Sequence, residues 1–130
     1  MEQHEAEKIA QDLFAQWNEL LQTGDKSKVA AMYSDDASFL PTLNGELKRG
    51  IKGAEEYFTH FLAKNPIGTV VESVTQISSD ESLIAYSGLY DFELDGESGR
   101  EIVHARFTFI FQKNSDGVYK IVHHHSSLRP

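Results

Sequence analysis

The sequence predicts an α+β fold in which helices cover one face of a curved antiparallel sheet. Two observations predict it. Apolar residues recur at helical spacing in the first half of the chain, and at the two-residue period of strands in the second half. Helices that come first and strands that follow are typical of α+β domains. No repeat or linker interrupts this order, so we expect one domain over residues 1–130.

The first helix is predicted over residues 3–23. Ile9, Leu13 and Trp17 recur there at spacings of three to four residues, which places them on one face of a helix. Gly24 follows and is a natural helix stop. We therefore expect this helix to bury an apolar stripe against the sheet.

Two shorter helices and a short strand are expected next. Asp25 can cap a second helix, which residues 34–36 (Ser-Asp-Asp) then break. Residues 37–40 are typical of a short strand ended by a proline. A third helix is predicted over residues 53–64, because its apolar residues, such as Tyr57 and Phe61, fall on one side. It ends there because the residue before Pro66 disfavours the helical region.

Four segments rich in β-branched and aromatic residues follow the third helix. They span residues 69–78, 83–94, 101–112 and 118–127. Residues typical of hairpin turns separate consecutive segments, so the segments should form an antiparallel meander.

Composition excludes several classes of function. The chain has 12 basic and 20 acidic residues and a formal charge of −8, which argues against nucleic acids and anionic membranes as partners. It has no cysteine, so disulfides and thiolate nucleophiles are excluded. No signal peptide and no apolar run of about 20 residues is present, and we expect a cytoplasmic protein. No glycine-rich nucleotide fingerprint is present, and no cofactor is expected.

Residues 101–112 leave open which face of their strand is buried. Phe107, Phe109 and Phe111 share one face, and His104 and Arg106 share the other. In one interpretation the phenylalanines point at the core and the polar residues are solvated. In the other, the phenylalanines are buried against a second subunit and Arg106 points into a cavity under the helices. The predicted function requires the second interpretation.

Three consecutive histidines occupy the last strand. The alternation of strand faces puts His123 and His125 with Ile121, and puts His124 on the opposite face with Ser126. His123 and His125 are plausible metal ligands by type, but no third ligand is evident from spacing, so no metal is expected.

Several segments together resemble the nuclear transport factor 2 cone superfamily. The similarity is greatest to the association (hub) domain of calcium/calmodulin-dependent protein kinase II and its stand-alone bacterial relatives. The segments that carry it are Ser34–Phe39, Gly50–Lys52, Ala85–Tyr86, Arg106 and Gly117–Ser126.

This resemblance implies a cone-shaped sheet covered on its concave face by about three helices. It also implies assembly into dimers that build rings, and no kinase activity of the domain itself. The family's pocket is lined by arginines that bind small carboxylates. Only Arg106 is retained here, while Gly88 and Ser126 stand at the other positions.

We therefore predict a homo-oligomeric protein with an apolar pocket anchored by Arg106, which binds a small carboxylate or an apolar molecule. Aromatic walls with one polar anchor are typical of small-molecule sites, although the same aromatic residues could simply fill the core. The predicted pocket residues are Trp17, Phe58, Phe61, Tyr86, Tyr90, His104, Arg106, His124 and Ser126. The predicted dimer interface is Phe107, Phe109 and Phe111.

The alternative is a small enzyme of the polyketide cyclase, dehydratase or isomerase type. His104, His124 and Tyr90 could act as its acid and base if they share the pocket, since the ordinary pKa of histidine is about 6.5; otherwise these histidines are structural. Ketosteroid isomerases carry a carboxylate base just before a proline, where this chain has Leu40. A leucine cannot accept a proton, which leaves Asp91 as the alternative carboxylate.

Overall fold

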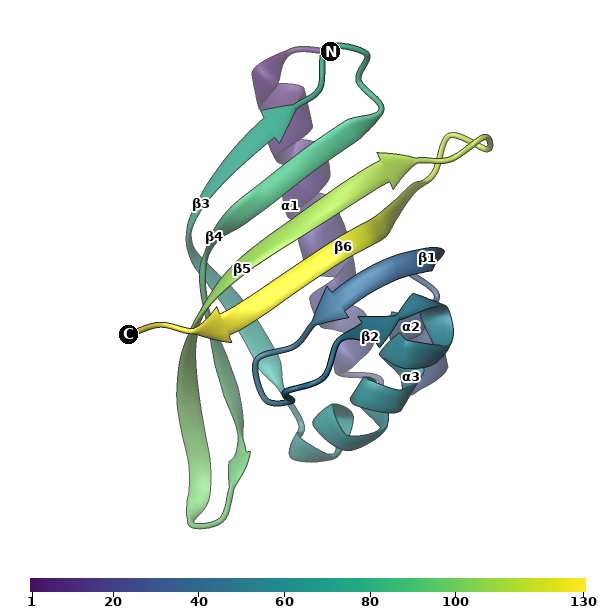
Figure 1. Cartoon of the computed structure of the whole chain (residues 1–130). Helices are drawn as coiled ribbons and strands as arrows, with labels where there is room; N and C mark the ends of the chain where they lie inside the picture. Colours follow the sequence, from purple (N-terminus) through teal and green to yellow (C-terminus); the bar gives the residue numbers. More distant parts are fainter.

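A computed structural model describes all 130 residues as one curved sheet with helices on one side (Figure 1). The helices are α1 (Gln3–Leu21), α2 (Lys26–Ala30) and α3 (Gly50–Phe61), with a short 3₁₀ turn η1 (Leu62–Lys64). The strands are β1 (Tyr33–Leu40), β2 (Lys48–Arg49), β3 (Ile67–Ile77), β4 (Leu83–Gly96), β5 (Gly99–Lys113) and β6 (Tyr119–Leu128). This arrangement confirms the predicted α+β class.

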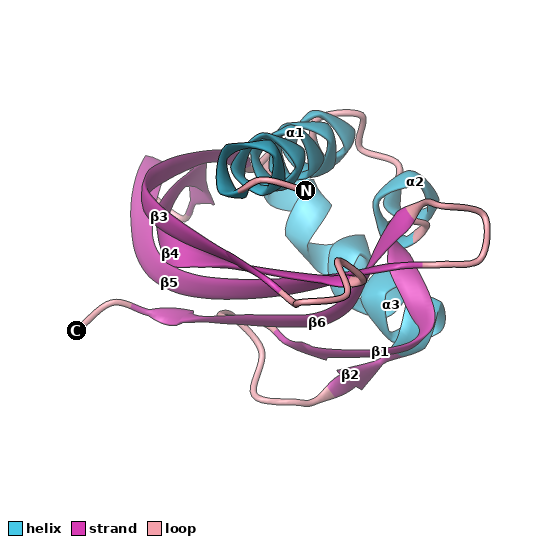
Figure 2. Cartoon of the chain, turned by 90° about the horizontal axis from the view of Figure 1, so that it is seen from above, coloured by secondary structure: helices cyan, strands magenta, loops and turns pink.

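The six strands lie in the order β2-β1-β6-β5-β4-β3. Strands β3 to β6 form the predicted antiparallel meander, whereas β1 pairs with β6 in parallel. Figure 2 shows α1 and α3 on the same side of the strands, with β3 curling up toward α1. One core of 26 buried residues fills the space between the helices and the concave face.

Helix α1 buries one stripe of its surface against the sheet. Ala6, Ala10, Phe14, Trp17 and Leu21 are its buried residues, at spacings of three and four. Trp17 and Leu21 are almost fully buried, at 2% and 1% exposure. The helical periodicity of the sequence is thus the pattern that attaches α1 to the strands.

The sheet bends sharply where β3 crosses β4. The register of this pair shifts between Val70 and Glu72, which leaves Val71 as an extra residue. Opposite the shift, a Cβ added to Gly88 would lie 2.0 Å from the carbonyl oxygen of Glu72. Glycine is therefore the residue that allows the two backbones to approach, and the bend follows from this contact.

Strand β1 begins earlier than predicted. Tyr33, Ala37 and Phe39 are its buried residues, and the expected break at residues 34–36 lies inside the strand. The register with β6 is irregular between Tyr33 and Ser38, so this polar segment occupies a bulge rather than a turn.

The third helix also begins earlier than predicted, at Gly50 instead of residue 53. Gly50 has a φ of +64°, and a Cβ there would lie 2.6 Å from the carbonyl oxygen of Asp35. A turn at this glycine starts the helix directly after β2, a strand of two residues that the sequence pattern did not predict.

The phenylalanine stripe of β5 faces the core of its own subunit. Phe107, Phe109 and Phe111 are 3%, 0% and 1% exposed. Phe109 pairs directly with Tyr86 of β4, and directly paired residues share a face, so the pairing fixes these rings on the concave side. The predicted dimer interface at these three residues is therefore wrong, and Arg106 lies exposed on the opposite face instead of under the helices.

Strand β6 contains a bulge that the alternation rule missed. Ile110 pairs with His123 and Phe111 pairs with Ile121, so Val122 is extra. Ile121 and His124 consequently both face the core, at 0% and 2% exposure. The prediction that these two residues lie on opposite faces is wrong, because one inserted residue reverses the parity of all that follow.

None of the helices combines the length and the apolar character needed to cross a lipid bilayer.

The position of Phe109 gives a test of this packing. We expect Phe109→Ala to lower the free energy of unfolding by about 3–5 kcal/mol, because it leaves a cavity among buried rings. Val118→Ala, in the β5–β6 turn and 48% exposed, should change it by about 0.5 kcal/mol or less. Urea denaturation followed by circular dichroism measures both. A small effect of Phe109→Ala would contradict the inward placement.

Candidate functional site

A narrow cavity opens between α1, α3 and the concave face of the sheet. The space that a water-sized sphere can enter is about 20 Å³, which is room for about one water molecule. The lining residues are Trp17, Phe39, Pro41, Thr42, Leu43, Tyr57, Phe58, Phe61, Tyr90, Phe92, Leu94, Val103, Ala105, His124 and Ser126. This lining contains no aspartate, glutamate, lysine or arginine, so the cavity is apolar with a few neutral polar groups.

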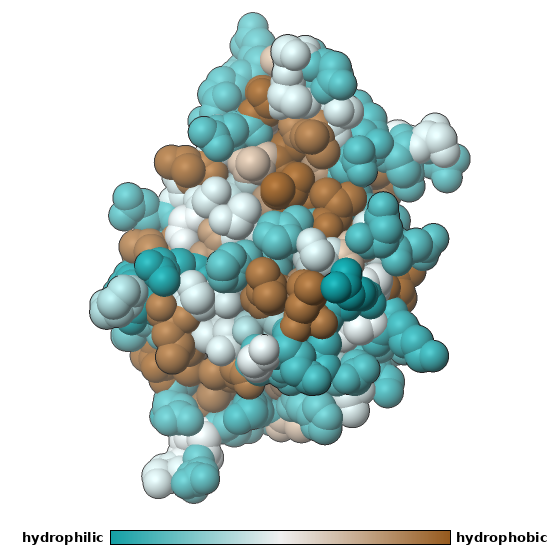
Figure 3. All heavy atoms as spheres, viewed as in Figure 1, coloured by the Kyte–Doolittle hydropathy of each residue, from teal (hydrophilic) through white to brown (hydrophobic).

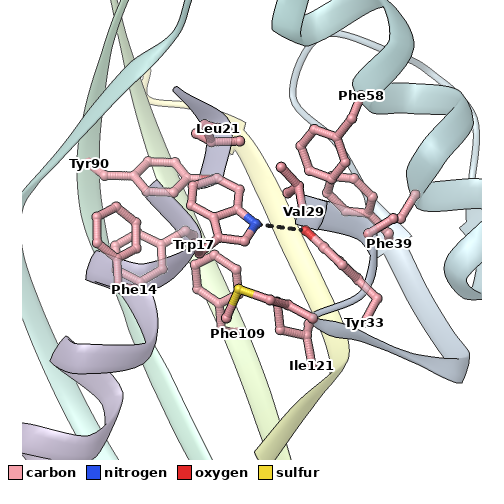
Figure 4. Close-up of a cluster of buried hydrophobic side chains, with 14 of the residues drawn as sticks. Phe14, Trp17, Leu21, Val29, Tyr33, Phe39, Phe58, Tyr90, Phe109 and Ile121 are labelled. Atoms are coloured by element: carbon pink, nitrogen blue, oxygen red, sulfur yellow. Dashed lines mark hydrogen bonds between the residues drawn. The ribbon is translucent and has the colours of Figure 1, made fainter. Parts of the chain in front are cut away.

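The polar groups of the cavity begin in the core with Trp17. Its indole Nε1–H donates to the hydroxyl of Tyr33 over 3.3 Å, as the dashed line in Figure 4 shows. The Tyr33 hydroxyl in turn lies 2.9 Å from Nδ1 of His124. These three side chains come from α1, β1 and β6, so the contact joins three separate elements.

The same line of contacts continues toward the mouth of the cavity. Nε2 of His124 lies 3.2 Å from the hydroxyl of Tyr90, and that hydroxyl donates to Oγ of Ser126 over 2.6 Å. Ser126 is hydrogen-bonded to the hydroxyl of Thr42, in the loop after β1. We call the six residues from Trp17 to Thr42 the polar chain. The bulge in β6 creates it, because it turns His124 and Ser126 inward.

The imidazole of His124 is enclosed by aromatic rings. It stacks on Phe109 with ring centroids 4.0 Å apart, and on Phe39 with centroids 4.6 Å apart. Burial, reinforced by the neighbouring His123 and His125, holds the pKa of His124 well below its ordinary value. His124 is therefore neutral at physiological pH and carries one ring proton.

The position of that proton follows from the neighbours. The indole N–H of Trp17 can only donate, so it occupies the Tyr33 oxygen as an acceptor. The buried Tyr33 hydroxyl has Nδ1 of His124 as its acceptor. Nδ1 is thus unprotonated and Nε2 carries the proton, which it donates to Tyr90. Burial also raises the pKa of Tyr33 and of Tyr90 well above the ordinary value, so both phenols keep their protons.

This arrangement restricts the chemistry of the cavity. The only basic nitrogen of His124 faces Tyr33, in the core, and cannot take a proton from a molecule in the cavity. No carboxylate lines the cavity to act in its place. The site can donate hydrogen bonds, but it lacks a general base.

Six of the nine predicted pocket residues line this cavity: Trp17, Phe58, Phe61, Tyr90, His124 and Ser126. Tyr86 is buried elsewhere, with its ring against Phe107. His104 and Arg106 lie on the open face of the sheet, so the prediction that Arg106 anchors the pocket is wrong. Arg106 bonds to Ser127 over 3.3 Å.

The three residues proposed as an acid–base set do not converge. His124 and Tyr90 share the cavity, whereas His104 is exposed on the other face and pairs with Asp91 over 2.7 Å. His104 and Asp91 are therefore both excluded from chemistry in the cavity by the alternation of strand faces.

Two residues of the polar chain, Tyr33 and Thr42, could not be predicted from the sequence. Tyr33 was missed because β1 was expected to begin four residues later. Thr42 lies in an irregular loop, and no periodicity predicts where its side chain points. His123 and His125 occupy the open face, where His123 bonds to Ser38 over 2.7 Å.

Comparison with known proteins identifies relatives. Residues 5–130 match the model of the calcium/calmodulin-dependent protein kinase II association domain family. A crystal structure from Xanthomonas campestris, described as a candidate association domain of that kinase, is 36% identical. The alignment covers 94% of this chain and 86% of that chain, with a TM-score of 0.88. No curated protein sequence matches significantly.

More distant structures share the fold. A candidate aromatic ring hydroxylase from Novosphingobium aromaticivorans is 18% identical over 100% of this chain and 94% of its own, with a TM-score of 0.82. A nuclear transport factor 2-like protein with a cystatin-like fold, from the same organism, is 12% identical. It covers 95% of this chain and 82% of its own, with a TM-score of 0.77.

The buried imidazole predicts a dependence of stability on pH. The pKa of His124 is lower in the folded than in the unfolded chain, so below about pH 6.5 the unfolded chain binds more protons. Stability should then fall as the pH falls, by up to about 1.4 kcal/mol per pH unit from this group. His124→Gln removes this term. Its deficit in free energy of unfolding relative to wild type should therefore shrink between about pH 7 and pH 5.

Urea unfolding at several pH values measures this deficit. His60→Gln is the control, because it makes the same change at an exposed position of α3 and His60 does not contribute to the lowered pKa of His124. A deficit of His124→Gln that stays constant with pH would contradict the buried neutral state.

Proposed function

Because the chain belongs to the calcium/calmodulin-dependent protein kinase II association domain family, we propose that it is a self-associating protein whose interior cavity binds a small molecule without converting it. The observation that carries the proposal is the cavity lining, which combines aromatic walls with one ordered line of polar groups. Apolar walls with few oriented polar groups are the usual composition of a small-molecule site.

The open face of the sheet is our candidate surface for self-association. Helices cover only the concave face, and Figure 3 shows hydrophobic groups distributed among polar ones on the side that faces the viewer in Figure 1. Val74 and Ile102 are 62% and 57% exposed there, and Leu89 and Ile110 are half-buried on the same face. The face therefore offers apolar contacts that a second copy of the chain could bury.

A charge in the middle of this face should prevent self-association. Ile110 lies between Ala85 and His123 of the neighbouring strands. We expect Ile110→Glu to convert wild-type dimers or larger assemblies into monomers, because burying an unpaired carboxylate in an interface is unfavourable. Light scattering coupled to size-exclusion chromatography at micromolar concentration measures the mass.

The control for this experiment is Val118→Glu. Val118 is 48% exposed in the β5–β6 turn, away from the sheet face, so this variant should assemble like wild type. A monomeric wild-type protein would contradict self-association, and an Ile110→Glu variant that still assembles would exclude this face.

Binding is favoured over catalysis by the orientation of the polar chain. Acid–base catalysis needs a group that can accept a proton from the bound molecule. His124 directs its basic nitrogen away from the cavity, and His104 lies outside it. The cyclase, dehydratase or isomerase alternative therefore lacks its base.

Filling the cavity should weaken the binding of small molecules. Ala105 is 1% exposed and lines the cavity from β5. We expect Ala105→Leu to reduce the affinity for small aromatic molecules by at least about tenfold, at a stability loss of about 1–3 kcal/mol from overpacking. Ligand-observed NMR with a panel of such molecules measures the affinity.

Ala15→Leu, at an exposed position of α1, is the control for the added side chain. Equal affinity in wild type and Ala105→Leu would place binding outside this cavity.

A further inference from the structure

The hydrogen bonds of the polar chain indicate what kind of molecule fits the cavity. We infer that the cavity selects a small uncharged molecule with a hydrogen-bond acceptor, such as the carbonyl oxygen of a ketone, aldehyde or ester. This inference rests on the proposed small-molecule binding and names the chemical class of its ligand.

The polar chain carries one more proton than it has acceptors for. The six groups of the polar chain each carry one proton: the Trp17 N–H, the His124 N–H and four hydroxyls. Five hydrogen bonds join these six groups in a line. One proton is therefore left without an acceptor inside the chain.

The direction of the hydrogen bonds locates that proton. Because Trp17 can only donate, each group donates a hydrogen bond to the next one: Tyr33 to His124, and His124 to Tyr90. Tyr90 then donates to Ser126. The remaining proton belongs to the Ser126–Thr42 pair, whichever of these two hydroxyls donates to the other.

The end of the polar chain is accessible from the cavity. Ser126 and Thr42 both line the cavity, and the structure contains no further hydrogen bond in which either hydroxyl donates. The free O–H is therefore available to a molecule in the cavity. Donors that follow one another in a line polarise each other, so this terminal O–H is a stronger donor than an isolated hydroxyl.

The lining of the cavity also restricts the charge of the ligand. A carboxylate would leave water for a cavity without arginine or lysine, and an ammonium would meet no carboxylate there. The nearby buried Lys48 is already paired with Glu46 and Glu56 and does not line the cavity. A neutral acceptor satisfies the free O–H without this desolvation penalty.

Shape adds a further restriction. The space that a water-sized sphere can enter is about 20 Å³, so a ligand must displace part of the wall. The loop of residues 41–47 has no helix or strand, and its Leu43 lines the cavity while remaining 45% exposed. Rotation of the Leu43 side chain would enlarge the cavity and leave the Thr42–Ser126 hydrogen bond intact. The aromatic walls then favour a flat molecule.

Four probes of similar size test the inference on the full chain. Acetophenone carries the carbonyl, and α-methylstyrene has the same shape with a CH₂ group in place of the oxygen. Benzoate and benzylammonium carry the two charges. Dissociation constants come from ligand-observed NMR titrations. We expect acetophenone to bind at least about fivefold more tightly than each of the other three.

A triple variant, Thr42→Val with Ser126→Ala and Tyr90→Phe, locates the donor. It removes both terminal hydroxyls together with the Tyr90 hydroxyl, which lines the cavity and would become the free donor once Ser126 no longer accepts from it. Acetophenone and α-methylstyrene should then bind within about twofold of each other. The control is Thr69→Val with Ser98→Ala, which removes two exposed hydroxyls outside the cavity and should retain the wild-type preference. Thermal unfolding verifies that both variants are folded.

The outcomes separate the two levels of the proposal. If α-methylstyrene, benzoate or benzylammonium binds as tightly as acetophenone, the inference about the acceptor is overturned while small-molecule binding stands. A carbonyl preference that survives in the variant lacking the hydroxyls of Thr42, Ser126 and Tyr90 overturns the assignment to the hydroxyl end of the polar chain. If no probe binds at millimolar concentration, the proposed function fails and the inference fails with it.

Discussion

The structure depends on how one imidazole is buried. His124 lies between the rings of Phe39 and Phe109, and its two nitrogens contact hydroxyls from β1 and β4. A buried polar group without partners is strongly unfavourable, so these contacts tie the position of β1 to that of β4 through β6. The same contacts fix the tautomer of His124 and, through it, the direction in which the hydroxyls of Tyr33 and Tyr90 donate. Packing and site chemistry therefore have a common origin.

The sequence predicted which segments form helices and strands better than it predicted which face of each strand is buried. The helical spacing in α1 and the two-residue period of β3 to β6 are strong signals, because each buries one continuous face. In β5 both faces are partly apolar, and only pairing with Tyr86 decides that Phe109 is inside. In β6 the parity reverses at Val122, an insertion that leaves no mark in the residue pattern. Most of the aromatic wall could be predicted, whereas Tyr33 and Thr42 depend on long-range pairing and on loop conformation.

The position of Arg106 differs from the one that the resemblance to the association domain family implied. The resemblance implied a pocket that holds anions by arginine, and this chain places its one retained arginine on the open face of the sheet, bonded to Ser127. The interior is left with hydroxyls and a neutral histidine. A shared fold is thus compatible with an interior of different polarity, because the two faces of one strand vary independently.

The parallel pairing of β1 with β6 has a consequence for how the protein folds. Tyr33 and His124 are 91 positions apart in the chain, so their contact closes a loop that contains most of the residues. Local hairpins of β3 to β6 can form early, whereas contacts of such sequence separation carry a large entropic penalty and form slowly. The cavity therefore exists only in fully folded molecules. A chain still emerging from the ribosome cannot form this cavity until β6 has been synthesised.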